Sequence, residues 1–424
     1  MIDPGVILLV TWDGGGNVPP MLALGRLLAR RGHQVRILGS ASLRNRITQL
    51  GLDFRAFVRL GELDRSPGTA IEDQLERFFG QLTSQELCDD VAEELDRKHT
   101  DVVVIDCMQM AAFGAAEARG ISTVVLVHYL PRYALEPSER RSVAVPLLNV
   151  SRASLGIDAL DPTVGPYHQL WPRCDGVLAA TLRQFDDAPF PLPPKLRYVG
   201  PILDPDPPDW EWDLPWPVDH PDPLVVVSFS STYQHQEEQL QRAVDALAPL
   251  AVRVLVTVGP GLDPADIHAP AGTVIRQWIP HAAVLPHTTL LITHAGHSTV
   301  MQAIAHAVPM VCVPTGRDQL VNANRVQACN LGIALEPNAS AGQIRAAVEP
   351  VLANPIYQRT VEAMATALQQ VETNPPSVRS KQSYRRRPSN VGERDYAVRD
   401  YVCLKRTKPY TNDPLGIVLN MYSG

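Results

Sequence analysis

A chain of 424 residues is too long for one hydrophobic core and suits two domains. Hydrophobic residues make up 45% of it and charged residues 20%, which is typical of a globular protein. The net charge of −7 argues against a dedicated nucleic-acid binder, which needs a basic face for phosphate contacts.

Hydrophobic segments and cysteines indicate the cellular compartment of the protein. No apolar run approaches the ~18 residues of a membrane span, and no basic segment precedes the short apolar run at 7–10. The six cysteines lie far apart without zinc-binding spacing, which indicates reduced thiols. We therefore expect a cytoplasmic protein, a monomer or weak dimer, with no metal site, membrane span or nucleic-acid partner.

The first half of the chain alternates strand and helix patterns. The apolar run Val6–Val10 predicts a buried parallel strand, and a glycine-rich turn and an amphipathic helix ending at Gly32 follow it. Further strands are expected at 35–38, 102–105, 123–127, 176–179 and 197–199, and helices at 74–98 and 110–119. This βαβ order predicts a parallel sheet, so residues 1–203 are expected to form one α/β domain.

Composition changes sharply between residues 204 and 223, where seven prolines prevent a helix or a central strand and indicate a semi-rigid linker. A second α/β domain is expected at 224–374. Its strands are predicted at 224–227, 252–258, 273–275, 290–293 and 310–313, and its helices at 237–250, 298–306, 322–329 and 341–352. Residues 375–424 are basic with little apolar periodicity, which indicates a poorly ordered tail, with an altered reading frame or an expression artefact as alternatives.

Residues 277–324 carry three groups of side chains suited to a nucleotide sugar. Trp278 offers a flat face on which a base can stack. The segment 294–299, between a strand and a helix, offers an imidazole, hydroxyls and backbone N–H groups to phosphate oxygens. Asp318 and Gln319 can hold vicinal sugar hydroxyls. Because all three groups follow the carboxyl ends of strands, we expect them in one crevice.

This segment resembles the donor-binding signature of family 1 glycosyltransferases, which include bacterial macrolide and natural-product enzymes. The resemblance extends from about residue 5 to about residue 370 and implies the GT-B fold, two Rossmann-like domains facing a central cleft. It implies an inverting, metal-independent hexosyltransferase. The donor would be UDP-glucose, a co-substrate rather than a cofactor, or alternatively a dTDP-deoxysugar. The acceptor would be a hydroxyl of a hydrophobic small molecule or a phenol, bound by the first domain.

The resemblance also implies roles for individual donor-site residues. Trp278 would stack on uracil and Gln302 would meet the ribose. His294, Ser298 and Thr299 would bind the diphosphate. The full expected donor-binding set is Ser230, Ser231, Trp278, His281, His294, Gly296, Ser298, Thr299, Gln302, Asp318 and Gln319.

The general base is the open question. Inverting transfer needs a group that takes the acceptor's proton, and the position matching the family's basic His or Asp is Asn17, whose carboxamide cannot do so near neutral pH. Three residues could replace it: Asp106 at the end of a strand, Asp13 in the same turn as Asn17, and His128 after the next strand. Asp13, Asn17 and Asp106 are the expected catalytic set, with Asn17 orienting the acceptor.

Two other functions compete with sugar transfer. Asn17 motivates a catalytically inactive homologue that binds a nucleotide sugar or a partner protein. A nucleotide-sugar 2-epimerase shares the two-domain plan, but the combination of Trp278 with Asp318 and Gln319 speaks against it.

Overall fold

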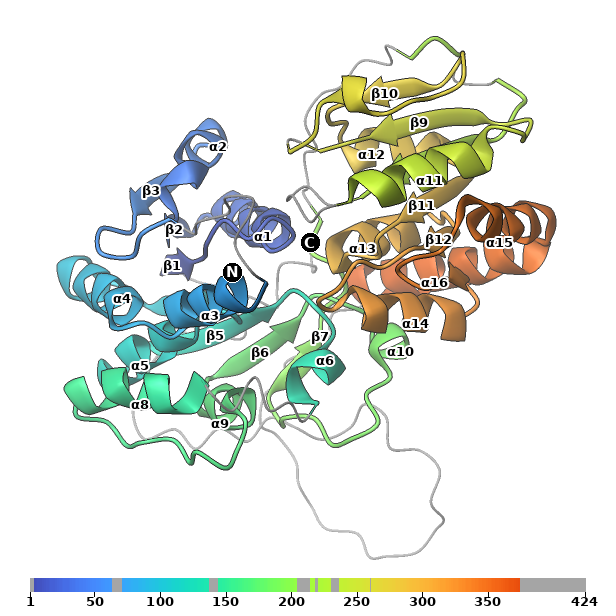
Figure 1. The fold of residues 1–424 in the computed structure, drawn as a ribbon. Coiled ribbons are helices and arrows are strands. Elements are labelled where there is room, and N and C mark those ends of the chain that lie inside the picture. The colour runs from blue at the N-terminus through green and yellow to red at the C-terminus, as the bar shows by residue number, and fades with distance from the viewer. Residues whose placement is uncertain are drawn as a thin grey trace, which may run out of the picture.

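The computed structural model describes residues 4–62, 71–136, 144–203, 214–217, 220–229, 236–259 and 261–373. Within these ranges the chain forms two parallel β-sheets, each with its own flanking helices. Figure 1 shows the first sheet in the blue-to-green half of the molecule and the second in the yellow-to-orange half. The expected α/β architecture with two doubly wound sheets is confirmed.

The first sheet has seven strands in the order β3-β2-β1-β4-β5-β6-β7, all of them paired in parallel. The strands are β1 (Val6–Val10), β2 (Gln34–Gly39), β3 (Asp53–Ala56), β4 (Val102–Asp106), β5 (Ser122–Val127), β6 (Gly176–Ala179) and β7 (Leu196–Tyr198). The helices of this half are α1 (Val18–Arg30), α2 (Arg44–Gln49), α3 (Ile71–Leu82), α4 (Gln85–Arg97), α5 (Met110–Ala118), α6 (Pro131–Leu135), α8 (Ala144–Ser154), α9 (Pro166–Arg173) and α10 (Arg183–Asp186).

The second sheet has six parallel strands in the order β10-β9-β8-β11-β12-β13. The strands are β8 (Leu224–Ser228), β9 (Arg253–Thr257), β10 (Val274–Arg276), β11 (Leu290–Thr293), β12 (Met310–Cys312) and β13 (Gly332–Ala334). The helices are α11 (Glu237–Leu247), α12 (His281–Val284), α13 (His297–Ala305), α14 (Gln319–Ala328), α15 (Ala341–Ala353) and α16 (Pro355–Thr373).

Strand order creates one ligand-binding position in each sheet. β1 lies between β2 and β4, and β8 lies between β9 and β11, so the chain reverses its direction of travel across the sheet at these points. The loops that leave neighbouring strands there diverge, and they open a crevice at the carboxyl edge of the sheet. The turn after β1 and the loop after β11 therefore occupy the two places where such folds bind ligands.

Local sequence signals explain where α1 begins and ends, and why the single helix expected at 74–98 is wrong. α1 begins after Asn17 with prolines in its first turn, and Gly32, at a φ of +88°, follows its end. A single helix was expected at 74–98. The structure has two helices instead, because the Ser84 hydroxyl accepts a hydrogen bond from the N–H of Leu87 and starts a new helix there.

The two halves touch through a shared apolar cluster and polar bonds. Leu182 and Phe185 of the first half are buried together with Met301 of the second. Arg325 of α14 donates from Nε to the carbonyl oxygen of Phe185 at 2.7 Å and lies 3.5 Å from the carboxylate of Asp187. α10 and α14 therefore fix the strand ends of one sheet against those of the other.

Several sequence expectations fall outside the described residues. These include most of the linker at 204–223 and the whole tail at 375–424.

The cysteines of the described part, Cys88, Cys107, Cys174, Cys312 and Cys329, are free thiols. Among the helices described, none combines the length and apolar character needed to cross a bilayer.

Candidate active site

Three adjacent strand ends of the first sheet bring polar side chains together around Asp106. Asp106 ends β4 and is fully buried. Its Oδ2 accepts hydrogen bonds from Asn17 Nδ2 at 2.7 Å and from Thr11 Oγ1 at 3.3 Å. Its Oδ1 accepts from the backbone N–H of Met108 at 3.0 Å and lies 3.0 Å from His128 Nε2. The carboxylate is therefore occupied on both oxygens.

Asn17 is held as firmly as Asp106. Its side chain is 3% exposed, and its Nδ2 also donates to the carbonyl oxygen of Trp12 at 2.8 Å. Its Oδ1 accepts from the N–H of Gly14 at 3.0 Å. The carboxamide thus ties the glycine-rich turn to β4, where its donor N–H group suits the carboxylate it meets.

His128 follows β5 and is 9% exposed. Burial lowers the pKa of its ring, but the neighbouring Cys107 and Asp106 outweigh burial and hold that pKa well above its usual value. Burial lowers the pKa of His297 and the charge of His128 adds to that effect, whereas at Asp318 the same charge offsets part of the rise that burial causes in the pKa. Leu130, two residues further along the chain, is buried in one apolar cluster with Ala295, so the end of β5 lies beside the loop that follows β11.

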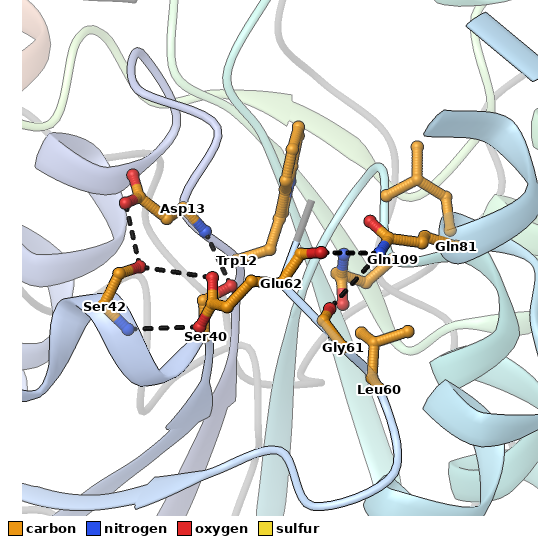
Figure 2. A pocket seen from close by; sticks show the side chains of 10 residues that line it. Trp12, Asp13, Ser40, Ser42, Leu60, Gly61, Glu62, Gln81 and Gln109 are labelled. Atoms are coloured by element: carbon orange, nitrogen blue, oxygen red, sulfur yellow. Dashed lines mark hydrogen bonds between the residues drawn. The ribbon is translucent and has the colours of Figure 1, made fainter. Parts of the chain in front are cut away.

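Asp13 lies in a different setting from Asp106. Its Oδ2 accepts a hydrogen bond from Ser42 Oγ at 2.9 Å, and its backbone N–H donates to Ser40 Oγ at 3.1 Å. Asp13 lines a cavity of about 200 Å³ at the carboxyl edge of the first sheet. Figure 2 shows Asp13 and Ser42 on one side of the Trp12 ring, with Gln109 and Gln81 on the other.

Two of the residues that line the cavity each carry a buried polar atom without a hydrogen-bond partner, the donor Nε1 of Trp12 and the acceptor Oε1 of Gln109. Trp12 is 9% exposed and Gln109 is 1% exposed. Unpaired buried polar groups cost free energy, so these two atoms are strained features of the cavity wall. The lining residues are Trp12, Asp13, Ser40, Ser42, Leu60, Gly61, Glu62, Gln81, Leu82 and Gln109.

In the second sheet, His294 follows β11 at the reversal point. It is 7% exposed, and burial, with smaller contributions from the charges of Arg317 and His281, lowers its pKa to about 3. The ring packs against the backbone of Gly296, where a Cβ would lie 2.5 Å from His294 Nε2. Glycine at 296 therefore lets the neutral imidazole lie directly over the start of α13.

The N-terminus of α13 is open to an anion. Gly296 is its N-cap residue and makes no side-chain capping bond. Ser298 and Thr299 are half-buried in the first turn, and Gln302 is half-buried one turn later. Uncapped N–H groups, helix dipole and hydroxyls together suit phosphate oxygens.

Asp318 is linked to this phosphate-binding loop by a residue that the sequence analysis missed. Asn322 donates from Nδ2 to Asp318 Oδ2 at 3.0 Å and to the carbonyl oxygen of Ala295 at 2.9 Å. Burial raises the pKa of Asp318. Gln319 is 2% exposed, and its Oε1 accepts from both the N–H and the hydroxyl of Thr315 at 2.7 Å. That oxygen therefore holds the loop before α14.

The remaining expected donor residues lie at neighbouring strand ends. Trp278, after β10, is 61% exposed and offers its ring to solvent. His281 Nε2 lies 2.9 Å from Ser228 Oγ, at the end of β8, and burial lowers the pKa of His281 to about 4. Ser230 and Ser231 lie outside the described residues.

Within the described part of the chain, one group of side chains has the proximity required of a metal site. Ligand atoms of Asp106, Cys107 and His128 lie within 4.8 Å of one another. In this group His128 Nε2 and the carboxylate of Asp106 face each other at hydrogen-bonding distance, 3.0 Å.

Comparisons with known proteins agree on one family and one fold. Residues 181–375 match the family described as "UDP-glucoronosyl and UDP-glucosyl transferase". The chain is 26% identical to 4'-demethylrebeccamycin synthase of Lentzea aerocolonigenes, over 83% of this chain and 93% of that protein. It matches the crystal structure of the kitacinnamycin glycotransferase with a TM-score of 0.71 at 21% identity, over 88% and 96% of the two chains. It matches glycosyltransferase VinC, solved in complex with dTDP, with a TM-score of 0.65 at 18% identity, over 86% and 96%.

Proposed function

We propose that this chain, a glycosyltransferase with the GT-B fold whose residues 181–375 match the family just described, moves a hexose from a nucleoside diphosphate to a small-molecule hydroxyl. The proposed transfer inverts the anomeric carbon and uses no metal ion. One observation carries this proposal. The described members of the donor set follow β10, β11 and β12 at the carboxyl edge of the second sheet, and β11 is one of the two strands between which this sheet reverses its strand order.

The donor-site geometry supports assigning different residues to the base, the ribose, the diphosphate and the sugar of the donor. The exposed ring of Trp278 suits the base, and Gln302 suits the ribose. His294 and the open N-terminus of α13 suit the diphosphate, with Ser230 and Ser231 assigned to the same region on the resemblance alone. Asp318 suits the sugar hydroxyls. Gln319 contributes indirectly, because its Oε1 accepts from Thr315 and holds the loop before α14 in place.

UDP-glucose is the first candidate for the donor, and a dTDP-deoxysugar is the second. The family model supports a uridine nucleotide, whereas the relative VinC was solved with dTDP. A stacking face accepts either pyrimidine, so Trp278 does not choose between them.

A metal is unnecessary for departure of the nucleotide in this geometry. The negative charge that develops on the diphosphate meets the positive end of the α13 dipole and its uncapped N–H groups. The acceptor would approach from the first half of the chain, opposite the leaving group, which inverts the anomeric carbon. Residues 1–203 would then bind the acceptor and residues 224–374 the donor.

The cavity beside Trp12 supports a phenolic or hydroxylated acceptor. The polar lining residues Asp13, Ser40 and Ser42 suit hydroxyl groups of such an acceptor that do not take part in the reaction. Apolar surface from Leu60 and Leu82 would cover the rest of the molecule.

The test is incubation of the protein with UDP-glucose or dTDP-glucose and a panel of phenols, without added metal, followed by mass spectrometry. The expected result is a product heavier by one hexose, which is lost in Asp318→Ala. Donor binding without transfer or hydrolysis would overturn the proposal and favour an inactive homologue, the alternative that Asn17 supports.

A further inference from the structure

We propose that His128, held by Asp106, takes the proton from the acceptor hydroxyl, and that Asn17 fixes Asp106 in place. This inference rests on the proposed function and names the base for that reaction. In the resembling family the base lies in the turn after β1. In this chain it would lie at the end of β5, on the other side of the same aspartate.

The hydrogen bonds exclude Asp106 itself as the group that meets the acceptor. It is fully buried, and its two oxygens accept from Asn17, Thr11 and the N–H of Met108 and face His128. A carboxylate held in this way can orient a histidine and stabilise its charged form. Asp106 is thus a positioning residue.

The position of His128 places it opposite the donor. Leu130, two residues beyond His128, is buried in one apolar cluster with Ala295 and Met301 of the second half. The end of β5 therefore lies beside the start of α13, the part of the second half that we assign to the diphosphate. Asp13 is instead bonded to Ser42 beside the cavity. His128 is therefore the better placed of the two to meet a hydroxyl that attacks the anomeric carbon.

The bonds and protons of the step balance. With Nε2 of His128 donating to Asp106, the lone pair of the neutral ring is on Nδ1, which receives the acceptor's proton. The acceptor oxygen forms a bond to the anomeric carbon, and the bond from that carbon to the phosphate oxygen breaks. Its electron pair leaves with the diphosphate, towards His294 and α13. The imidazolium beside Asp106 then returns its proton to water.

The surroundings of His128 give the reaction a characteristic pH dependence. Asp106 and Cys107 face it from the end of β4, Tyr129 is its neighbour on the chain, and His297 and Asp318 face it from the second half. Burial lowers the pKa of His128, but Cys107 and Asp106 outweigh burial and hold that pKa above its usual value. The neutral form, which acts as a base, therefore grows as pH rises through that higher pKa. kcat/KM should rise over the same range.

A second histidine–aspartate pair provides a matched control. His99 Nε2 lies 3.0 Å from Asp101 Oδ1, the same separation as in the His128–Asp106 pair. The His99 pair lies just before β4, at the opposite end of the strand that Asp106 ends, and the His99 side chain is 75% exposed. His99→Asn therefore makes the same chemical change away from both sites.

The experiment measures transfer rates and UDP affinity for the full chain and its variants. His128→Asn and His128→Gln should lose roughly 100-fold or more in kcat, the usual contribution of a positioned base, while the Kd for UDP stays within about twofold. His99→Asn should keep wild-type kcat. Asp106→Asn should move the rising limb of the pH profile to lower pH, which a merely structural role would not do.

Returning a histidine to position 17 tests the relocation directly. In the double variant Asn17→His/His128→Asn, the new imidazole would again neighbour Asp106, and transfer should recover at least tenfold over His128→Asn. If the wild type transfers sugar and both His128 variants keep more than about a tenth of its kcat, the base assignment is wrong and the proposed function stands. If the wild type binds UDP and transfers nothing, the proposed function itself fails.

Discussion

Replacing Gly296 with alanine would set a methyl group against the ring of His294. The new Cβ would lie 2.5 Å from Nε2 and 3.0 Å from Cε1, closer than carbon and nitrogen atoms pack. The backbone at Gly296 has φ −59° and ψ 135°, which any residue adopts, so the clash is the whole effect. His294 must therefore turn away from the N-terminus of α13.

The magnitude follows from the contact that is lost. A hydrogen bond to a charged phosphate oxygen contributes about 1.5–3 kcal/mol, so Gly296→Ala should weaken UDP binding about 10- to 150-fold. Overpacking of the buried ring should cost about 1–3 kcal/mol of folding free energy. Calorimetric titration with UDP at a temperature well below the melting transition separates the two effects.

Two comparisons make the prediction refutable. Gly342 lies in the first turn of α15, where an added Cβ would have its nearest neighbour at 3.9 Å, so Gly342→Ala should bind UDP as the wild type does. In a His294→Ala background, Gly296→Ala should add little further loss, because the ring it displaces is gone. Wild-type UDP affinity in Gly296→Ala, or fully additive losses in the double variant, would refute the reasoning.

Three further predictions concern stacking, pH and metal. Trp278→Ala should weaken UDP binding by about 1–3 kcal/mol and Trp278→Phe by less, as measured by the same titration; equal affinity in all three proteins would contradict stacking. Burial lowers the pKa values of His281, His294 and His297 to about 4, 3 and 3, so the unfolded chain binds more protons than the folded chain below about pH 6.5. As pH drops from 7 to 5, the free energy of unfolding should therefore fall by up to about 1.4 kcal/mol per pH unit and histidine, and the urea midpoint should fall with it; a constant midpoint would exclude this. Transfer should survive EDTA, whereas loss of activity that Mg²⁺ or Mn²⁺ restores would point to a metal at the active site.

Most strands could be predicted from the sequence, because a buried parallel strand is a short, nearly continuous apolar run, as at Val6–Val10. Two strands were missed for the same reason. β3 is only partly buried and two of its four residues are charged, and β13 is three residues long. α16 (Pro355–Thr373) was also not predicted.

The residues of the donor segment lie close together in the sequence, so a linear motif was enough to select them. Trp278, His294 and Asp318 all fall within a stretch that alternates strands with the starts of helices, and the structure places each of them after a strand. The support that Asn322 gives to Asp318 and Ala295 could not be predicted, because it depends on how α14 packs against the neighbouring loop.

The sequence by itself determined that polar residues follow β1, β4 and β5, and that Asn17 stands where a base was expected. Only the tertiary structure decided how these residues meet. Asn17 is 89 residues from Asp106, and His128 is 22 residues beyond it, but the sheet order places β1, β4 and β5 side by side. One aspartate therefore holds both side chains, an arrangement that depends on strand neighbours and that residue spacing along the chain does not record.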